Sequence, residues 1–197
     1  MFDWRVVEQA EYSRQAEPSF VELTTRSYLT SSGVARAHTA DPLFLRRAAA
    51  VKQLAELISQ GAATGLLIEG FKAYHPYPVQ AVWQGDHFKI WLKQPLFIDR
   101  AVYEKAMMQA DLTEPIDFEQ LAEGSEIQAA VPGPLTADAS VLAKLRQAVV
   151  AGGYHLLDEE SHRELYLDGL PLTERKLVLV RLAFDPAGKR PSYAARN

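Results

Sequence analysis

Hydrophobic and polar residues follow two different periods along this chain, which predicts a mixture of strands and helices. Residues 20–30 are rich in β-branched and aromatic side chains and predict a strand. Residues 79–83 and 88–92 predict two more strands joined by a tight turn at Gly85-Asp86. In the second of these, hydrophobic side chains alternate with polar and mixed ones, so one face is expected to be buried.

The first predicted helix has a signal at each end. Asp41 supplies an N-cap acceptor and Pro42 stands at the first helical position, and Gly61 is a typical stop. The sequence then predicts a helix over 99–108 capped by Asp99, followed by a less regular acidic segment over 111–124 and a strand over 125–131. The next predicted helix is begun by Thr136 or Asp138 and ended by Gly152-Gly153. Two strands follow, over 163–167 and 177–184.

The order of these elements is strand–helix–strand–strand, a joining helix, and strand–helix–strand–strand again. We therefore expect an α+β domain over 1–185 with pseudo-repeats at about 20–95 and 125–184. Two such units can pack sheet against sheet or edge to edge. Either arrangement leaves a cleft at the junction, where ligand sites tend to lie. Residues 186–197 are expected to form a flexible C-terminal tail.

Composition narrows the function classes. The chain has 197 residues, 48% of them hydrophobic, which is enough for one substantial core or two small lobes. The net charge of −4 is spread without a basic block, which argues against direct binding to nucleic acid. There is no cysteine, no readable signal peptide and no apolar stretch of about 20 residues, so we expect a cytoplasmic protein without membrane contact.

The usual catalytic motifs are absent from the sequence. There is no Gly-rich phosphate loop, no Gly-x-Ser-x-Gly and no His-Glu-x-x-His. His162-Arg163-Glu164 is similar to the His-x-Glu of zinc deaminases, but the cysteines that those enzymes need cannot exist here. The histidines, at positions 38, 75, 87, 155 and 162, lack the spacing of metal ligands. The sequence therefore predicts no metal site and no cofactor.

Glu164 is the candidate for a chemical role. On a strand, His162, Glu164 and Tyr166 share one face. A carboxylate between two ring side chains in a half-buried strand could have a raised pKa and act as a base towards water. It could equally be the counter-charge of a cationic ligand held against aromatic rings. An ordinary solvent-facing glutamate beside Arg163 fits the spacing as well.

Aromatic residues concentrate before and within the predicted hairpin. Pro76 and Pro78 hold the approach to it extended, so its aromatic side chains could wall a cleft. On that hypothesis Trp83→Ala abolishes ligand binding and leaves the fold intact. The alternative is that Trp83 and Phe88 are simply core residues.

Four segments of the chain, in order and spacing, resemble the GyrI-like small-molecule-binding proteins of the multidrug effector-binding superfamily. Residues 77–83 are similar to the family's Tyr-Pro-Leu-Glu-Gly-Val-Trp, and 93–95 to its Arg-Gln-Pro. Residues 162–167 are similar to His-Arg-Glu-Ile-Tyr-Leu, and 173–177 to Pro-Glu-Lys-Leu-Lys. The resemblance extends over residues 2–184.

This resemblance implies two βαββ modules of the SHS2 type, related by pseudo-twofold symmetry, with an aromatic ligand cleft around a central carboxylate. Relatives are drug-sensing effector domains, stand-alone drug-sequestering proteins or gyrase inhibitors, and one branch hydrolyses cyclopropane-bearing DNA-alkylating compounds. On matching positions the carboxylate would be Glu164, catalytic if the protein is an enzyme. The candidate ligand-binding residues are Phe71, Tyr74, Tyr77, Trp83, Trp91 and Tyr166.

The sequence also departs from the family pattern. Gln80 and Ala73 stand where acids are expected, and residues 130–135 lack the polar groups of His-x-Gly-x-Tyr. A cleft with fewer groups to orient water favours binding over catalysis. We therefore expect a stand-alone binder of flat hydrophobic or cationic aromatic compounds. The alternatives are a cyclopropanoid hydrolase and a gyrase-interacting inhibitor or protector. A transcription factor is not expected, because no helix-turn-helix lies outside the α+β elements.

Overall fold

The computed structural model describes residues 1–136 and 139–188 of the chain. Its helices are α1 (Trp4–Val7), α2 (Pro42–Gln60), α3 (Arg100–Ala110) and α4 (Ser140–Ala151), with short 3-10 turns η1 (His38–Ala40), η2 (Gly61–Thr64) and η3 (Pro186–Gly188). Its strands are β1 (Ser19–Leu23), β2 (Arg26–Val34), β3 (Gln80–Gln84), β4 (His87–Gln94), β5 (Asp117–Leu121), β6 (Gly124–Pro132), β7 (His155–Leu156), β8 (Ser161–Tyr166) and β9 (Leu177–Asp185).

The strands form one antiparallel sheet in the order β1-β6-β9-β8-β3-β4-β2-β5, and β7 pairs with the end of β9. One βαββ module is β2–α2–β3–β4 and the other is β6–α4–β8–β9, and the two meet where β3 pairs with β8. From the junction outward, the strand order is β3-β4-β2 in one module and β8-β9-β6 in the other, so equivalent strands occupy equivalent positions. The prediction of two βαββ modules with pseudo-twofold symmetry is therefore confirmed, and they join edge to edge.

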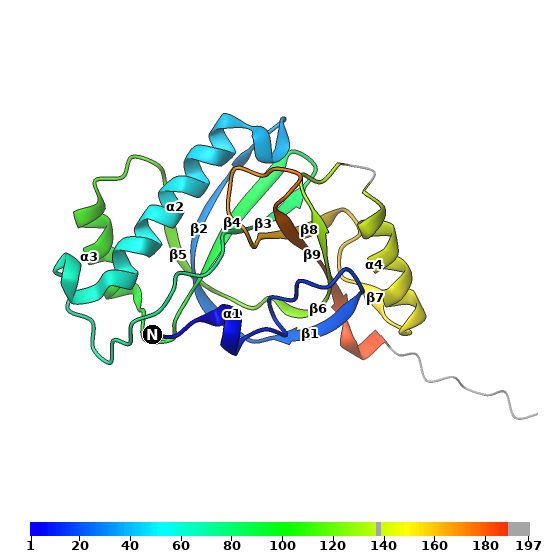
Figure 1. Cartoon of the computed structure of the whole chain (residues 1–197), viewed down its shortest axis with the longest axis horizontal. Coiled ribbons are helices and arrows are strands. Elements are labelled where there is room, and N and C mark those ends of the chain that lie inside the picture. The colour runs from blue at the N-terminus through cyan, green and yellow to red at the C-terminus, as the bar shows by residue number, and fades with distance from the viewer. Residues whose placement is uncertain (137–138, 189–197) are drawn as a thin grey trace, which may run out of the picture.

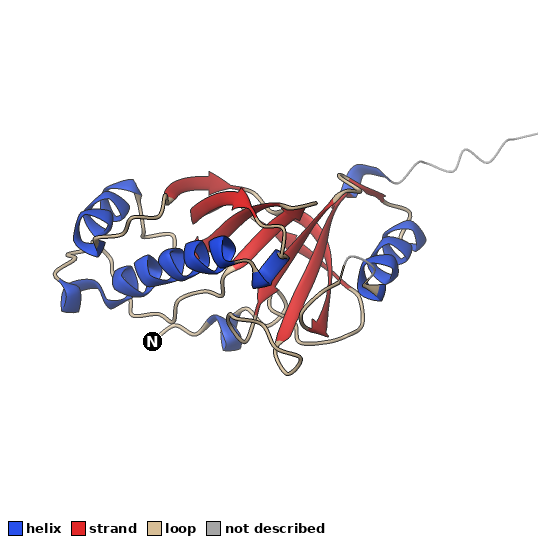
Figure 2. Ribbon diagram, turned by 90° about the horizontal axis from the view of Figure 1, so that it is seen from above, coloured by secondary structure: helices blue, strands red, loops and turns tan. Residues whose placement is uncertain are grey.

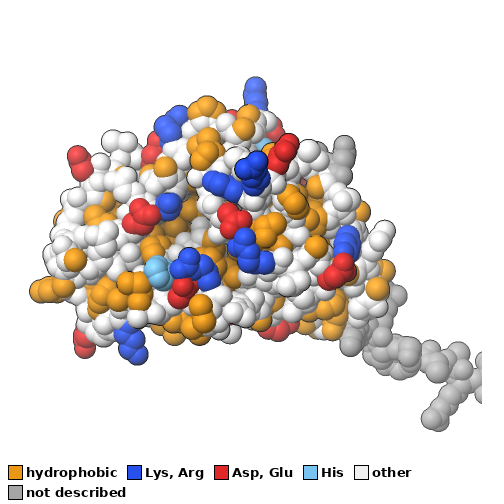
Figure 3. All heavy atoms as spheres, viewed as in Figure 1, with side chains coloured by type: hydrophobic (Ala, Val, Ile, Leu, Met, Phe, Trp, Pro, Cys, Tyr) orange, Lys and Arg blue, Asp and Glu red, His pale blue; other side chains and the backbone are white. Residues whose placement is uncertain are grey.

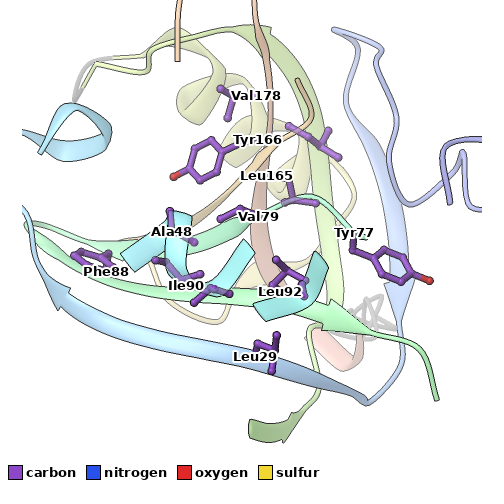
Figure 4. Close-up of a cluster of buried hydrophobic side chains, with 14 of the residues drawn as sticks. Leu29, Ala48, Tyr77, Val79, Phe88, Ile90, Leu92, Leu165, Tyr166 and Val178 are labelled. Carbon is purple, nitrogen blue, oxygen red and sulfur yellow. The ribbon is translucent and has the colours of Figure 1, made fainter. Parts of the chain in front are cut away.

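The two long helices cover different halves of the sheet. Helix α2 packs against β2 and β4, and α4 packs against β6 and β9. Figures 1 and 2 show the two helices well apart, with strands between them. The middle strands, β3 and β8, therefore lie between the two helices. The core includes Leu29, Ile90 and Leu92 from the sheet and Ala48 from α2 (Figure 4).

The helix ends follow from the capping residues. The Asp41 carboxylate accepts a hydrogen bond from the Leu43 N–H at 2.9 Å, and Asp99 accepts one from the Val102 N–H at 2.9 Å. Both predicted starts are confirmed. Helix α4 begins after Ala139 instead of at Thr136, and the alternative cap Asp138 lies outside the described residues.

Two strand predictions need correction. Residues 20–30 form two strands, because β1 pairs with β6 whereas β2 pairs with β4 and β5 in the other half of the sheet. The acidic segment 111–124 contains β5, which the sequence does not predict. Charged residues such as Asp117 and Glu119 are typical of strands at the edge of a sheet, where they discourage pairing with another chain.

The C-terminal tail, the surface and the helices complete the description of the fold. Of the predicted tail, residues 186–188 form η3, and residues 189–197 lie outside the described part of the chain. On the face shown in Figure 3, acidic and basic side chains are interspersed with hydrophobic ones. Within residues 1–136 and 139–188, none of the helices has the length and apolar character that crossing a bilayer requires.

Candidate functional site

Glu164 lies on β8, at the junction of the two modules. Its Cα pairs with Ala81 of β3 on one side and with Val180 of β9 on the other. The side chain is completely buried. The predicted strand face is observed, because His162 and Tyr166 flank Glu164 on the same side of the sheet. An exposed glutamate beside Arg163 is therefore excluded.

Two imidazoles converge on one oxygen of the Glu164 carboxylate. The Nε2 atom of His162 is 2.8 Å from Glu164 Oε1, and the Nε2 atom of His38 is 3.2 Å from the same oxygen. The other oxygen, Oε2, is buried without a hydrogen-bond partner. His38 comes from η1, just before α2, and sequence reasoning missed it because no local pattern connects this turn with β8.

The electrostatics of Glu164 differ from the expectation. Burial by itself raises the pKa of this carboxyl, but hydrogen bonds from His162 and His38 outweigh burial and hold the pKa below its usual value. An ionised carboxylate can only accept, so each Nε2 atom must carry a proton and donate it. The prediction of a raised pKa is therefore wrong. Glu164 is an ionised acceptor with one oxygen still free.

Trp83 is a core residue. Its side chain is fully buried against Phe44 and Phe88, and its ring lies 3.9 Å, centroid to centroid, from the ring of His38. The Trp83 Nε1–H donates a hydrogen bond of 3.0 Å to the Tyr166 hydroxyl. Trp83 therefore packs against His38 and holds the Tyr166 hydroxyl. It is not among the residues that line the cavity described below.

Tyr166 connects Glu164 with that cavity. Burial, together with the neighbouring charge of Glu164, raises the pKa of Tyr166 well above its usual value, so the hydroxyl stays protonated. The hydroxyl already accepts from Trp83, which leaves its hydrogen available for Glu164 or a ligand. Tyr166 also lines the cavity, and Figure 4 shows it close to Val79.

The cavity has a volume of about 460 Å³. It lies between α2, the extended segment 75–79 and the loop that follows β8. Aromatic and apolar side chains make up much of its wall, including Trp4, Leu45, Tyr77, Pro78, Val79, Tyr166 and Leu170. Charged side chains at the cavity are Arg5, Lys52 and Glu56. Sequence reasoning missed Trp4 and the loop after β8, because both reach the cavity only through the tertiary fold.

The predicted aromatic residues separate into two groups. Tyr77 and Tyr166 line the cavity. The other candidates lie elsewhere among the described residues: Trp83 in the core, Phe71 and Tyr74 against Phe97, and Trp91 against Tyr28 and Arg163. The Tyr77 hydroxyl donates to Glu8 Oε1 at 3.1 Å and points away from Tyr166, as Figure 4 shows.

The opposite face of the sheet carries a second buried carboxylate, Glu123. The Arg181 Nη1 donates to it at 2.9 Å, the Tyr28 hydroxyl at 2.5 Å and the Gln80 amide at 3.0 Å. Burial alone would raise its pKa, but the charges of Arg163 and Arg181, with these hydrogen bonds, lower the pKa of Glu123 to about 2. Gln80 therefore has a structural role.

The fold is shared with proteins of known structure. A hydrolase from Listeria innocua is 18% identical, with a TM-score of 0.79 over 94% of this chain and 100% of that chain. A conserved protein from the same species is 17% identical, with a TM-score of 0.80 over 94% and 100%. The C-terminal domain of EcmrR is 10% identical, with a TM-score of 0.52 over 86% and 97%.

Because the sequence identities are low, these similarities show a common fold and nothing about function. No protein-family model matches the chain, and no curated protein sequence matches it significantly.

Proposed function

We propose that this protein binds small, flat hydrophobic or cationic aromatic molecules in the cavity between α2, segment 75–79 and the loop after β8. The observation that carries the proposal is the cavity itself. Its volume of about 460 Å³ is within the usual range for small-molecule sites, and its walls are mainly apolar and aromatic. The rings of Tyr77 and Tyr166 provide surfaces on which a flat ligand can pack.

Charge adds selectivity to this site. Glu164 lies behind Tyr166, and its negative charge is balanced only in part by the imidazoles that hold it. A cationic ligand against the Tyr166 ring is attracted by both the ring and the carboxylate. Lys52 and Glu56 form an ion pair of 3.4 Å at the cavity, so neither is a free charge that would dominate recognition.

The cavity can be tested by filling it. Ala49 is an exposed α2 residue that lines the cavity, so Ala49→Trp should obstruct it without disturbing the core. We expect ethidium, rhodamine 6G or neutral pyrene to quench the fluorescence of Trp4, which also lines the cavity. Ala49→Trp should weaken the best of these probes at least tenfold.

The matched control is Ala101→Trp, at an exposed position of α3 away from the cavity. It should bind like the parent protein. Absence of saturable quenching by every probe, or equal affinity in Ala49→Trp and Ala101→Trp, would contradict the proposal.

A second candidate function is hydrolysis of cyclopropane-bearing DNA-alkylating compounds. The specific observation in its favour is Glu164 Oε2, which is buried, has no hydrogen-bond partner and lies beside the protonated Tyr166. Water would pass a proton to Oε2 as its oxygen bonds to a ring carbon. The strained carbon–carbon bond would break, and its electron pair would take up a proton. The Listeria hydrolase with the same fold supports this candidate.

Mass spectrometry tests the second candidate directly. The substrate should gain one water with the parent protein and with Glu56→Gln, a control at the cavity, but not with Glu164→Gln. Binding without a change in mass leaves the protein as a binder only. Among the described residues, no observation favours an inhibitor or protector of DNA gyrase, and we do not propose it.

A further inference from the structure

His38, His162 and Glu164 bring three metal-ligating groups together between the two long helices. One donor atom from each of the three lies within 4.8 Å of the others. Two imidazole nitrogens and one carboxylate oxygen form the donor set that catalytic zinc and non-haem iron sites use, with further positions left for water. The sequence predicts no metal site because the two histidines are far apart along the chain, and the fold brings them together.

The separations of these atoms suit an ion. Neighbouring ligands of a tetrahedral zinc, bound at about 2.0–2.1 Å, lie roughly 3.3–3.4 Å apart. The distance from His38 Nε2 to Glu164 Oε1 is 3.2 Å, close to that value. The distance from His162 Nε2 to the same oxygen is 2.8 Å, so the His162 ring would move outward by roughly half an ångström.

The charge of the carboxylate calls for a cation. Glu164 is fully buried, and the ion-pair partners it has in the described part of the chain are His38 and His162. Neither has the permanent charge of an arginine or lysine side chain, and Oε2 has no hydrogen-bond partner. A buried carboxylate in this state is costly, and a divalent ion would supply the missing positive charge.

The fold holds His38 in place before any ion arrives. Its φ of 51° is in the left-handed region, which is uncommon for a residue other than glycine. Backbone hydrogen bonds on both sides of His38, to Ala35 and from Asp41, hold this turn, and the ring packs on Trp83 at 3.9 Å. Such strain is typical of residues placed for binding or catalysis.

The site is also accessible. The side chain of His38 is 30% exposed and that of His162 is 19% exposed, whereas Glu164 is buried beneath them. An ion can therefore arrive from solvent on the imidazole side and keep water in its remaining positions.

We propose that His38, His162 and Glu164 bind a divalent transition-metal ion such as Zn²⁺, with solvent completing its coordination. None of the three residues is among those that line the ligand cavity, so the proposal does not depend on ligand binding there.

The test uses the full chain without a histidine tag, freed of metal with EDTA. Calorimetric titration with ZnCl₂ should show one site per chain, and Co²⁺ should give the visible absorption of a low-coordinate complex. His38→Ala, His162→Ala and Glu164→Ala should each weaken Zn²⁺ binding at least tenfold. His155→Ala, at an exposed position, should leave it unchanged.

X-ray absorption of the Zn²⁺-loaded parent protein provides a measurement that needs no variant. Its spectrum should show two imidazole ligands with oxygen completing the shell. A parent protein that binds neither Zn²⁺ nor Co²⁺ overturns the proposal, and the three residues are then a hydrogen-bonded cluster only. Fewer than two imidazoles in the spectrum, or equal affinity in all variants, overturns it as well.

Discussion

Glu123 and Glu164 are both buried carboxylates, and they lie on opposite faces of the same sheet. Glu123 is held by Arg181, Tyr28 and Gln80, and Arg163 lies 3.6 Å away. Glu164 has two imidazoles on one oxygen and no hydrogen-bond partner on the other. Burial is therefore similar in the two cases, and the partners differ.

The partners decide what each carboxylate can do. Guanidinium groups are charged at any pH that proteins experience, so Glu123 stays ionised down to about pH 2 and its contribution is structural. Imidazoles bind metal ions, so the surroundings of Glu164 can change when an ion is present. The difference indicates that one carboxylate stabilises the sheet and that the other is available for binding or chemistry.

The largest expected effect is on the Glu123 side. Arg181→Met keeps most of the side-chain volume but leaves Glu123 and Glu126 with Arg163 as their remaining guanidinium partner. We expect a loss of about 4 kcal/mol in the free energy of unfolding, because a buried charge is left uncompensated. Urea denaturation measures it, with the exposed Arg175→Met as control. A loss below about 1 kcal/mol would mean that the network does not stabilise the fold.

The next effect tests what supports the Glu164 side. Trp83→Ala removes a fully buried ring that packs on His38 and donates to Tyr166. We expect a loss of about 3 kcal/mol, at the lower end for such truncations, because the partly exposed His38 can relax into the space. This replaces the expectation that Trp83→Ala leaves the fold intact. The measurement is urea denaturation of the variant. Unchanged stability would contradict a core role for Trp83 and favour its role as a wall of the cleft.

The third prediction concerns the loss of stability at low pH as Glu123 is protonated. The pKa of Glu123 is about 2 in the folded protein and near 4.5 when unfolded, so the unfolded chain binds the proton first as pH falls. The stability it contributes is complete above about pH 4.5 and is lost as the pH falls from there through about pH 2, by about 3 kcal/mol.

Glu126 acts in the opposite sense, because burial raises its pKa, and both glutamates face Arg163 and Arg181. The contribution of Glu123 is therefore measured as the difference between the parent protein and Glu123→Gln in urea at each pH. That difference should shrink as the pH falls. A difference that is constant with pH would show that Glu123 does not titrate as described.

The smallest expected effect is that of Glu164→Gln in metal-free protein. The amide oxygen can still accept from both imidazoles, and the lost charge had no guanidinium to compensate it. We expect a change of less than about 1 kcal/mol in either direction, measured in urea beside Glu123→Gln at pH 7. A loss of stability as large as that of Arg181→Met would show that Glu164, like Glu123, stabilises the fold.

Local patterns predicted most of the fold. The cap at Asp41, the cap at Asp99 and the hairpin turn at Gly85-Asp86 act over a few residues, and a sequence shows them directly. The break between β1 and β2 was missed because it depends on which distant strands each one joins.

The candidate site was predictable only in part for the same reason. The shared face of His162, Glu164 and Tyr166 follows from the two-residue period of a strand. The approach of His38 to Glu164, by contrast, depends on the position of η1 beneath the sheet junction. The sequence also failed to predict that the pKa of Glu164 is lowered, because His38 is one of the residues that lower it.

The pairing of β3 with β8 also has a consequence during synthesis of the chain. The first module leaves the ribosome with His38 and Trp83 but without Glu164, His162 or Tyr166, which are synthesised later as part of β8. No nascent chain that lacks the second module can hold the acid next to its partners. Assembly of the site therefore requires that both modules have been synthesised.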